Sequence, residues 1–368
     1  MQTIVGIRRL EETLCRSEGN GDNWHMTWAQ DNKQYVVLGD GKGWPDIAAY
    51  TGQTYHSRVY GLNGDPPDLM FEHLHGYPDL VDVANAPKIR YYGVGILATD
   101  KFIYHFLSAP SQSADPPAPR FVGSKLIFSP DQGLTWNNQD GSALRWENGL
   151  YQSRENMVFF DEPDEVFSLI TLLQMGRNYE HNRDGYVYGY APNGNGQATT
   201  KQLAMFRVPT DRILDRSAYE FFVSCSVGGS AIWSRDIEKR GVVHAFDQCS
   251  WPWTCWHPSV VYNSPLEVFM MANWSMGYGP DGPSLDKPSY LGFWVADKPW
   301  GPWIQVHEET EWMPGGDHQA RAYQPQIAPK WIAQDGRSFW LVFSDFQSVD
   351  GAYPYYCFNC QKVEIITA

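Results

Sequence analysis

The sequence predicts an all-β protein that folds as a five-bladed β-propeller in a single domain, residues 1–368. Three observations point to this class. A strand–turn–strand cassette recurs five times at intervals of roughly 60–100 residues, as expected for one cassette per blade. Helical periodicity is sparse, and segments rich in Pro and Gly separate the cassettes. Aromatic residues make up 15% of the chain, which suits the faces of β-sheets.

Each cassette pairs an apolar strand with a second strand rich in aromatic residues. In chain order the cassettes are 22–31 with 35–40, 92–100 with 102–106, 156–161 with 166–170, 257–263 with 268–272, and 323–331 with 339–343. The blades are therefore expected near residues 20–60, 88–150, 154–210, 230–300 and 301–368. A strand near Thr3–Ile7 or Lys362–Ile366 is expected to complete a blade and close the ring, because closure removes exposed sheet edges.

Two local patterns add to this picture. Residues 129–136 match the Asp-box pattern S-x-D-x-G-x-T-W, a hairpin turn in which Ser and Asp bond the backbone while Trp packs beneath. The Asp box has a structural role in propellers and does not indicate catalysis. Residues 211–222 follow a Pro and carry a partly helical pattern, which predicts a short helical insertion between blades three and four.

Charge and hydropathy exclude several classes of partner. The net charge of −14 and the absence of basic runs argue against nucleic acid. No segment approaches the roughly 18 apolar residues that a membrane span needs. The first residues lack a secretory leader, which predicts a cytoplasmic location, or secretion if a leader has been removed. The sequence leaves the oligomeric state open.

The cysteines and histidines do not predict a metal centre. Cys357 and Cys360 form one close pair, but a zinc site needs a second pair at suitable spacing. Free thiols and disulfides both remain open. His73 and His75 fall in a segment that we expect to be a loop over the pocket, without a third ligand. We therefore expect no cofactor, although a structural cation in the central channel is compatible with the sequence.

Propeller geometry selects the candidate site. The start of the first cassette strand and the end of the second must lie on one face of the disc. The predicted ring comprises Asp22 and Asp40 from blade one, Tyr91 and Tyr92 from blade two, Glu155, Asn156 and Arg177 from blade three, His257 and Asn273 from blade four, and Gln324 and Asp345 from blade five. Acids, amides, one His and one Arg suit a polyhydroxylated ligand, whose hydroxyls need donors and acceptors.

Two aspartates of blade one are the sharpest catalytic candidates. Asp22 and Asp40 flank a single hairpin, which places both carboxylates at the mouth of the channel. Glycoside hydrolysis needs two carboxylates roughly 5–10 Å apart. Asp40 lies between two glycines, so a simple turn residue is the alternative interpretation. Glu155 is the candidate for a further acid. Contact with the substrate is expected from Trp24, Tyr92, Asn156, Arg177, His257, Asn273, Gln324 and Asp345.

Three segments of the chain resemble a known family. They are Gly21–Gly41, with its Asp-Asn-Trp and Gly-Asp-Gly motifs, Asp184-Gly-Tyr-Val-Tyr188, and Tyr323-Gln-Pro-Gln-Ile-Ala-Pro-Lys-Trp331. Together they resemble the five-bladed propellers of the DUF4185 type, which include the endo-D-arabinanases of glycoside hydrolase family 183. The resemblance implies an enzyme that cleaves furanosidic or similar linkages, with Asp22 and Asp40 as its paired catalytic aspartates. It does not transfer the substrate, because the loops that shape the subsites differ between subfamilies.

Two other functions remain open from the sequence. A propeller-type polysaccharide lyase would use a Tyr/His pair and an Arg, which Tyr92, His257 and Arg177 could supply. A non-catalytic glycan-binding propeller usually repeats one pocket per blade. Here the ring differs at each blade and gathers its carboxylates in blade one, which favours a glycoside hydrolase acting on a carbohydrate substrate.

Overall fold

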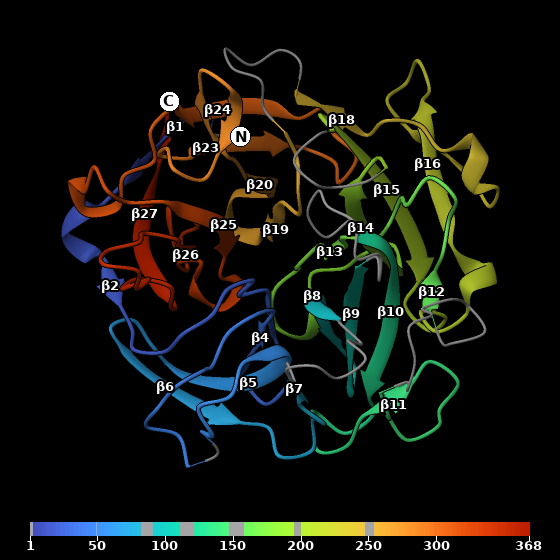
Figure 1. Cartoon of the computed structure of the whole chain (residues 1–368). Helices are drawn as coiled ribbons and strands as arrows, with labels where there is room; N and C mark the ends of the chain where they lie inside the picture. Colours follow the sequence, from blue (N-terminus) through green and yellow to red (C-terminus); the bar gives the residue numbers. More distant parts are fainter. Residues whose placement is uncertain are drawn as a thin grey trace.

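Five antiparallel sheets are arranged around a central axis as the blades of a propeller (Figure 1). The computed structural model describes residues 3–48, 50–81, 91–110, 121–146, 158–194, 200–246 and 254–368. The expected all-β, five-bladed class is confirmed. Within these ranges the helices are single 3-10 turns: η1 (Glu11–Thr13), η3 (Arg177–Tyr179), η4 (Arg216–Ala218), η5 (Ile237–Lys239), η7 (Ser264–Leu266), η8 (Pro314–Gly316) and η9 (Pro329–Trp331).

Blades one and two follow the order of the chain from the axis outwards. Blade one contains β3 (Met26–Trp28), β4 (Gln34–Leu38), β5 (Tyr55–Asp65) and β6 (Asp68–His73), with β7 (Leu80–Val81) beside β5. Blade two contains β8 (Tyr92–Thr99), β9 (Phe102–Pro110), β10 (Phe121–Ser129) and β11 (Asn137–Asn138). β12 (Val158–Phe160) also pairs with β10. Buried strands without polar alternation fit sheets that are covered on both faces.

Blades three and four complete the far side of the ring. Blade three contains β13 (Thr171–Leu172), β14 (Tyr186–Pro192), β15 (Gln202–Pro209), β16 (Glu220–Cys225) and β17 (Ala231–Ser234), with β18 (His244–Ala245) beside β15. Blade four contains β19 (Ser259–Asn263), β20 (Val268–Ser275), β23 (Tyr290–Ala296) and β24 (Ile304–Glu309). A small hairpin of β21 (Gly277–Gly279) and β22 (Gly282–Ser284) projects from blade four.

Blade five joins the two ends of the chain. It contains β25 (Ala322–Ile327), β26 (Ser338–Asp345), β27 (Asn359–Thr367) and β1 (Ile4–Arg9), with β2 (Cys15–Arg16) also paired to β27. Ile4 lies opposite Thr367 in the β1–β27 ladder, so the termini lie close together at the same blade (Figure 1). The expected closure by terminal strands is confirmed, with both segments in one blade.

Two expectations for the middle of the chain are wrong. The third cassette is not the start of blade three, because 158–160 pairs with β10 at the edge of blade two and 166–170 forms no strand. The innermost strand of blade three is β13 instead. The expected helix at 211–222 is only the 3-10 turn η4 followed by β16. In both segments the apolar residues form a local pattern that fits more than one structure. Pairing with a strand elsewhere in the sequence determines which one forms.

The Ser129–Trp136 turn connects β10 to β11 through a dense set of hydrogen bonds. Ser129 Oγ accepts from the Gly133 N–H at 2.7 Å. Asp131 accepts from the N–H and the hydroxyl of Thr135 at 2.8 and 2.7 Å. Trp136 is buried and meets Tyr77 edge-on, with ring centroids 5.1 Å apart. The turn therefore anchors the outer edge of blade two.

Five cysteines lie within the described residues, and all five are free thiols. Across the same ranges, no helix has the length and apolar character to cross a membrane.

Candidate active site

A cavity of about 200 Å³ opens at the axis of the propeller, on the face where the innermost strands begin. Every blade contributes to its wall. Its lining residues are Asp22, Asn23, Asp40, Tyr92, Val94, Phe121, Leu169, Trp256, His257, Trp274, Leu285, Tyr323, Gln324 and Phe346. We call this the central cavity. Among these residues the only ionisable carboxyl groups are those of Asp22 and Asp40.

Asp22 and Asp40 occupy opposed positions at the open end of the β3–β4 hairpin. They form an antiparallel bridge in which the Asp22 N–H donates to the Asp40 carbonyl at 3.0 Å. The flanking glycines permit this close approach. A Cβ on Gly41 would lie 2.3 Å from the Asn20 carbonyl oxygen, and one on Gly39 would lie 2.5 Å from the Asn23 side chain. The glycines beside Asp40 thus serve the pairing of two segments and do not reduce Asp40 to a turn residue.

The carboxyl group of Asp22 is held from two directions. Tyr323 Oη donates to Asp22 Oδ2 at 2.8 Å, and Asn23 Nδ2 donates to Oδ1 at 2.9 Å. Burial raises the pKa of Asp22 to about 8, and repulsion from Asp40 adds to this, while hydrogen bonds from Tyr323 and Tyr356 oppose the rise. Asp22 therefore retains its proton at neutral pH.

Asp40 has a more open environment. Its side chain is 40% exposed, and His56 Nδ1 lies 3.8 Å from Asp40 Oδ1. Tyr356 Oη donates to the Asp40 backbone carbonyl at 3.2 Å, which fixes the chain at this point. The two carboxyl groups thus share one cavity but differ in environment, which is the arrangement that separates the roles of paired acids.

Two buried histidines lie side by side below the cavity. His25 Nε2 and His257 Nδ1 are 3.0 Å apart and share one hydrogen bond. Burial lowers the pKa of His257 to about 3 and also lowers the pKa of His25. Both rings are therefore neutral, and His257 presents an uncharged imidazole to the central cavity.

Aromatic side chains form one wall of the cavity. Trp256 and Trp274 are stacked with centroids 5.6 Å apart and an interplanar angle of 22°. Tyr323 meets Trp274 edge-on at 5.6 Å, so the residue that binds Asp22 also belongs to this wall. Flat aromatic faces bind the apolar faces of sugar rings by the same stacking that pairs aromatic side chains.

Two amide residues of the cavity have left-handed backbones. Asn23 has φ 58° and Gln324 has φ 55°. Asn23 Oδ1 and Gln324 Oε1 are buried acceptors without a hydrogen-bond partner among the described residues. Positive φ at a non-glycine residue is uncommon and clusters at functional sites. These acceptors are free to receive hydrogen bonds from a ligand's hydroxyls.

The structure brings five of the sequence-predicted site residues together in the central cavity. They are Asp22, Asp40, Tyr92, His257 and Gln324. Glu155 and Asn156 lie outside the described residues. The other predicted residues, Tyr91, Trp24, Arg177, Asn273 and Asp345, are placed elsewhere, and Tyr91 is fully buried in the hydrophobic core.

Trp24 is a core residue, so the expectation that it contacts substrate is wrong. Its side chain is fully buried, and Nε1 donates to Ser344 Oγ at 2.7 Å. The left-handed backbone at Asn23 interrupts the alternation of an extended strand. Trp24 consequently does not share the face of Asp22.

Asn273 and Asp345 also bond the protein instead of lining the cavity. Asn273 Nδ2 donates to the Thr254 carbonyl at 3.1 Å. Asp345 Oδ1 accepts from the Arg321 N–H at 2.7 Å, and burial raises the pKa of Asp345. Both residues lie at ends of second strands, whose side chains turn toward the neighbouring loops. Their immediate neighbours Trp274 and Phe346 reach the cavity.

Arg177 lies at the other end of the channel. Leu169 lines the central cavity, and the chain then runs down the axis through β13 to Arg177 in η3. Near the end of this path the Gln174 carbonyl accepts from the N–H of Tyr262 at 2.8 Å, and Tyr262 lies near the end of β19 in blade four. Arg177 was misplaced because blade three was expected to begin at residues 156–161. The innermost strand is β13, and Arg177 follows its far end, on the face opposite the central cavity.

Sequence reasoning missed several residues of the site. Tyr323, Trp256 and Trp274 line the cavity, and Tyr356 supports both aspartates. Tyr323 precedes Gln324 at the start of the fifth cassette, which is the signal that could have identified it. Tyr356 lies in the loop between β26 and β27, where no pattern marks it.

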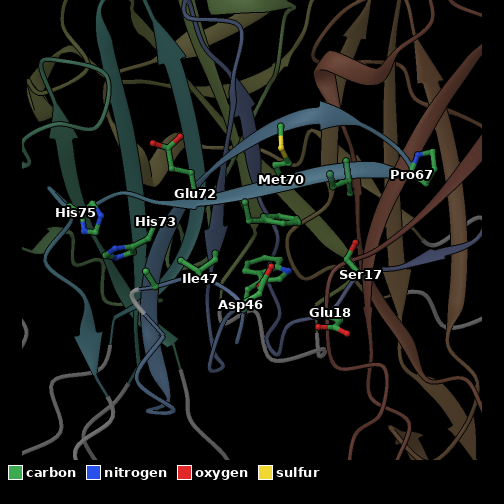
Figure 2. A pocket seen from close by; sticks show the side chains of 13 residues that line it. Ser17, Glu18, Asp46, Ile47, Pro67, Met70, Glu72, His73 and His75 are labelled. Carbon is green, nitrogen blue, oxygen red and sulfur yellow. The ribbon is translucent and has the colours of Figure 1, made fainter.

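A different cavity, of about 640 Å³, lies on the flank of blade one (Figure 2). Its labelled residues include Met70, Glu72 and His73 from the outermost strand β6, followed by His75. The expectation that His73 and His75 cover the central pocket is therefore wrong. His73 Nε2 instead lies 3.2 Å from Asp79 Oδ1. Over the described ranges, no cluster of three or more His, Cys, Asp or Glu residues is arranged to hold a metal ion.

Comparisons with known proteins identify the fold. No family model matches the chain, and no curated protein matches its sequence. Solved structures do resemble it, at low sequence identity.

A candidate hydrolase from Bacteroides ovatus has 13% identity and a TM-score of 0.57, covering 95% of this chain and 87% of its own. A xylan β-1,4-xylosidase from Bacillus halodurans has 8% identity and a TM-score of 0.52, covering 95% of this chain and 56% of its own. A thermostable family-43 glycoside hydrolase has 11% identity and a TM-score of 0.50, and the match covers 96% of this chain and 91% of its own. At these identities the similarity establishes a shared propeller architecture.

Proposed function

We propose that the protein is a retaining glycoside hydrolase, with Asp22 as the acid/base and Asp40 as the nucleophile. The observation that carries this proposal is the opposed pair of carboxylates in the aromatic central cavity. The propeller architecture shared with a xylosidase and a family-43 glycoside hydrolase agrees with it.

The bridge between the two residues favours retention of configuration in this proposal. Opposed residues of an antiparallel pair point to the same face, with Cβ atoms about 4.5–5.5 Å apart. Retaining glycosidases hold their carboxyl groups about 5–5.5 Å apart, whereas inverting enzymes need about 6.5–9.5 Å to admit a water. A bridge between Asp22 and Asp40 therefore suits direct attack on the sugar.

The environments of the two groups support the division of roles. Asp22 retains its proton at neutral pH and can donate it to a leaving oxygen. Asp40 is the more exposed carboxyl group and lies within 3.8 Å of His56. The carboxyl group that is open to the cavity is the suitable nucleophile, because it can reach the anomeric carbon of a bound sugar.

The reaction then proceeds in two balanced steps. A carboxylate oxygen of Asp40 attacks the anomeric carbon, the bond to the leaving oxygen breaks, and Asp22 protonates that oxygen. The product is an ester between the sugar and Asp40. In the second step Asp22, now a carboxylate, takes a proton from water, which attacks the anomeric carbon and releases Asp40. Asp22 is reprotonated by this step, so the site returns to its starting state.

The substrate class follows from the cavity and from the family resemblance. The central cavity has about 200 Å³ and suits one sugar ring, since sites for larger ligands occupy about 300–1,000 Å³. The resemblance to DUF4185-type propellers and glycoside hydrolase family 183 implies a furanosidic or similar linkage, and we take an arabinofuranosyl linkage as the candidate to test. Neutral His257 and the free acceptors of Asn23 and Gln324 suit sugar hydroxyls.

The lyase alternative receives less support from the geometry. Tyr92 and His257 both line the central cavity, but Arg177 is absent from its wall and follows the opposite end of β13. Among the described residues that line the cavity, none is the cation that would neutralise a uronate beside the Tyr/His pair.

A product assay tests the proposal. The protein is incubated with α-(1→5)-linked D-arabinofuranosyl oligosaccharides and other glycans, and both reducing ends and absorbance near 235 nm are followed. We expect new reducing ends without absorbance, and their loss in Asp22→Asn and Asp40→Asn proteins of unchanged circular dichroism. Full turnover in both variants overturns the proposal. Products that absorb near 235 nm also overturn it and indicate a polysaccharide lyase instead.

A further inference from the structure

A second cavity opens directly beside the central one. It has about 690 Å³ and is lined by Leu285, Asp286, Gln319, Arg321, Phe346, Ser348, Val349 and Tyr353. Leu285 and Phe346 line both cavities, so the two spaces meet at these side chains. We call this space the outer subsite. It lies over the loops of blades four and five.

The wall of the outer subsite exposes apolar surface. Phe346 and Tyr353 are stacked, with centroids 4.4 Å apart and an interplanar angle of 29°. Tyr353 is 44% exposed, Val349 43% and Leu285 39%. Large apolar residues gathered at one place on the surface mark binding sites more often than isolated ones do. The stack continues the aromatic wall of the central cavity outwards, because Phe346 also meets Tyr323 edge-on at 6.1 Å.

Arg321 adds a polar donor to this surface. Its Nη1 donates to the carbonyls of His318 and Ala320 at 3.2 and 2.6 Å. Among the described residues it forms no ion pair with a carboxylate, and its side chain is only partly buried. Since a guanidinium carries five N–H donors, several remain for hydroxyls of a ligand.

A buried aspartate fixes the two sides of the outer subsite relative to one another. Asp345 Oδ1 accepts from the N–H groups of Arg321 and Gln347, at 2.7 and 3.1 Å. The Phe346 N–H donates to the Arg321 carbonyl at 2.9 Å. Asp345 therefore holds the Arg321 backbone against the loop that carries Phe346. Preorganisation of this kind lowers the entropic cost of binding.

We propose that the outer subsite binds a second unit of the sugar chain whose reacting unit occupies the central cavity. This inference rests on the proposed function and extends it to substrates of at least two sugars. Phe346 and Tyr353 stack on the ring, and Arg321 donates to its hydroxyls. The sugar chain is uncharged, because Asp40 and Asp286 along the path disfavour an acidic glycan.

Kinetics with substrates of two lengths test the subsite. The kcat/KM of an α-(1→5)-linked D-arabinofuranosyl pentaose is divided by that of p-nitrophenyl α-D-arabinofuranoside. In Tyr353→Ala and Arg321→Ala we expect this ratio to fall about tenfold, mainly through KM for the pentaose. Ile232→Ala, which removes a 47% exposed apolar side chain on blade three, is the control and leaves the ratio unchanged. An unchanged ratio in both test variants overturns the subsite and leaves the hydrolase standing.

A binding experiment separates the two proposals. Asp22→Asn protein is titrated calorimetrically with the arabinofuranosyl disaccharide, triose and pentaose. Affinity that rises with length and falls in Asp22→Asn/Tyr353→Ala supports the subsite, even where the wild-type protein hydrolyses none of these sugars. Affinity that does not depend on length, or that Tyr353→Ala leaves intact, overturns it.

Discussion

Asp22 and Asp40 face each other across the open end of one hairpin, with the Asp22 N–H 3.0 Å from the Asp40 carbonyl oxygen. This pairing places two carboxyl groups in one small cavity, where they cannot both ionise without mutual repulsion. Burial and that repulsion both keep the proton on Asp22. The chemistry, the pH dependence and the stability of the protein are therefore linked through one pair of residues.

Azide should distinguish the roles of the two aspartates. We expect Asp22→Ala and Asp40→Ala each to lose about 10²–10⁴-fold in kcat/KM on oligosaccharides. On an aryl arabinofuranoside, azide should rescue Asp22→Ala by displacing Asp40 from the ester, giving a glycosyl azide of retained configuration. In Asp40→Ala, azide should displace the aryl group directly and give inverted configuration. NMR of the products checks this, and the same configuration from both variants contradicts the assignment.

Tyr323 should set the alkaline limit of activity. Activity requires protonated Asp22, so kcat/KM should fall as pH rises through about 8. The hydrogen bond from Tyr323 favours the carboxylate, and its removal should raise the pKa of Asp22 further. Since hydrogen bonds to charged groups contribute about 1.5–3 kcal/mol, we expect Tyr323→Phe to move the limb up by about one pH unit or more. A pH–rate profile measures this shift.

Tyr35→Phe is the matched control for that experiment. Tyr35 Oη donates to Asp31 Oδ2 at 2.9 Å, a comparable bond at the outer end of the hairpin. Its loss should leave the limb in place. A limb that moves equally in both variants, or moves downward in Tyr323→Phe, would show that Tyr323 does not act through Asp22.

Asp22→Asn should make the protein more stable at alkaline pH. The pKa of Asp22 is raised on folding, so the folded state binds a proton that the unfolded state has lost above about pH 4. This stabilising contribution is present at low pH and declines until the pH passes about 8. Asn is neutral throughout. The Tm of Asp22→Asn minus that of the wild type should therefore be more positive at pH 8.5 than at pH 4, by about 2 °C or more. A difference independent of pH would contradict the raised pKa.

Asp131→Ala should affect stability alone. Asp131 accepts two hydrogen bonds from Thr135 in the turn that anchors β11, far from the central cavity. Their loss should destabilise the protein by about 1–3 kcal/mol. Urea unfolding measures this change, and kcat/KM of the folded variant should match that of the wild type. A fall in kcat/KM at unchanged stability would indicate that the turn reaches the active site.

Much of the fold could be predicted because strand patterns are local. Four of the five cassettes correspond to the inner strands of a blade, and the first contains the whole Asp22–Asp40 pair within one hairpin. The third failed because the 158–160 segment pairs with β10 of blade two. An apolar run predicts that a strand is buried, but it does not predict which sheet the strand joins.

The amino-acid sequence by itself determined the all-β class, the closing terminal strands and the hairpin that carries both aspartates. Only the tertiary structure decided what surrounds them. Tyr323 reaches Asp22 across 301 positions of sequence because ring closure brings blade five beside blade one. The same closure buries Trp24 against Ser344. Alternation along a strand selects the face on which a side chain lies, whereas its contacts depend on the neighbouring blade, which is distant in sequence.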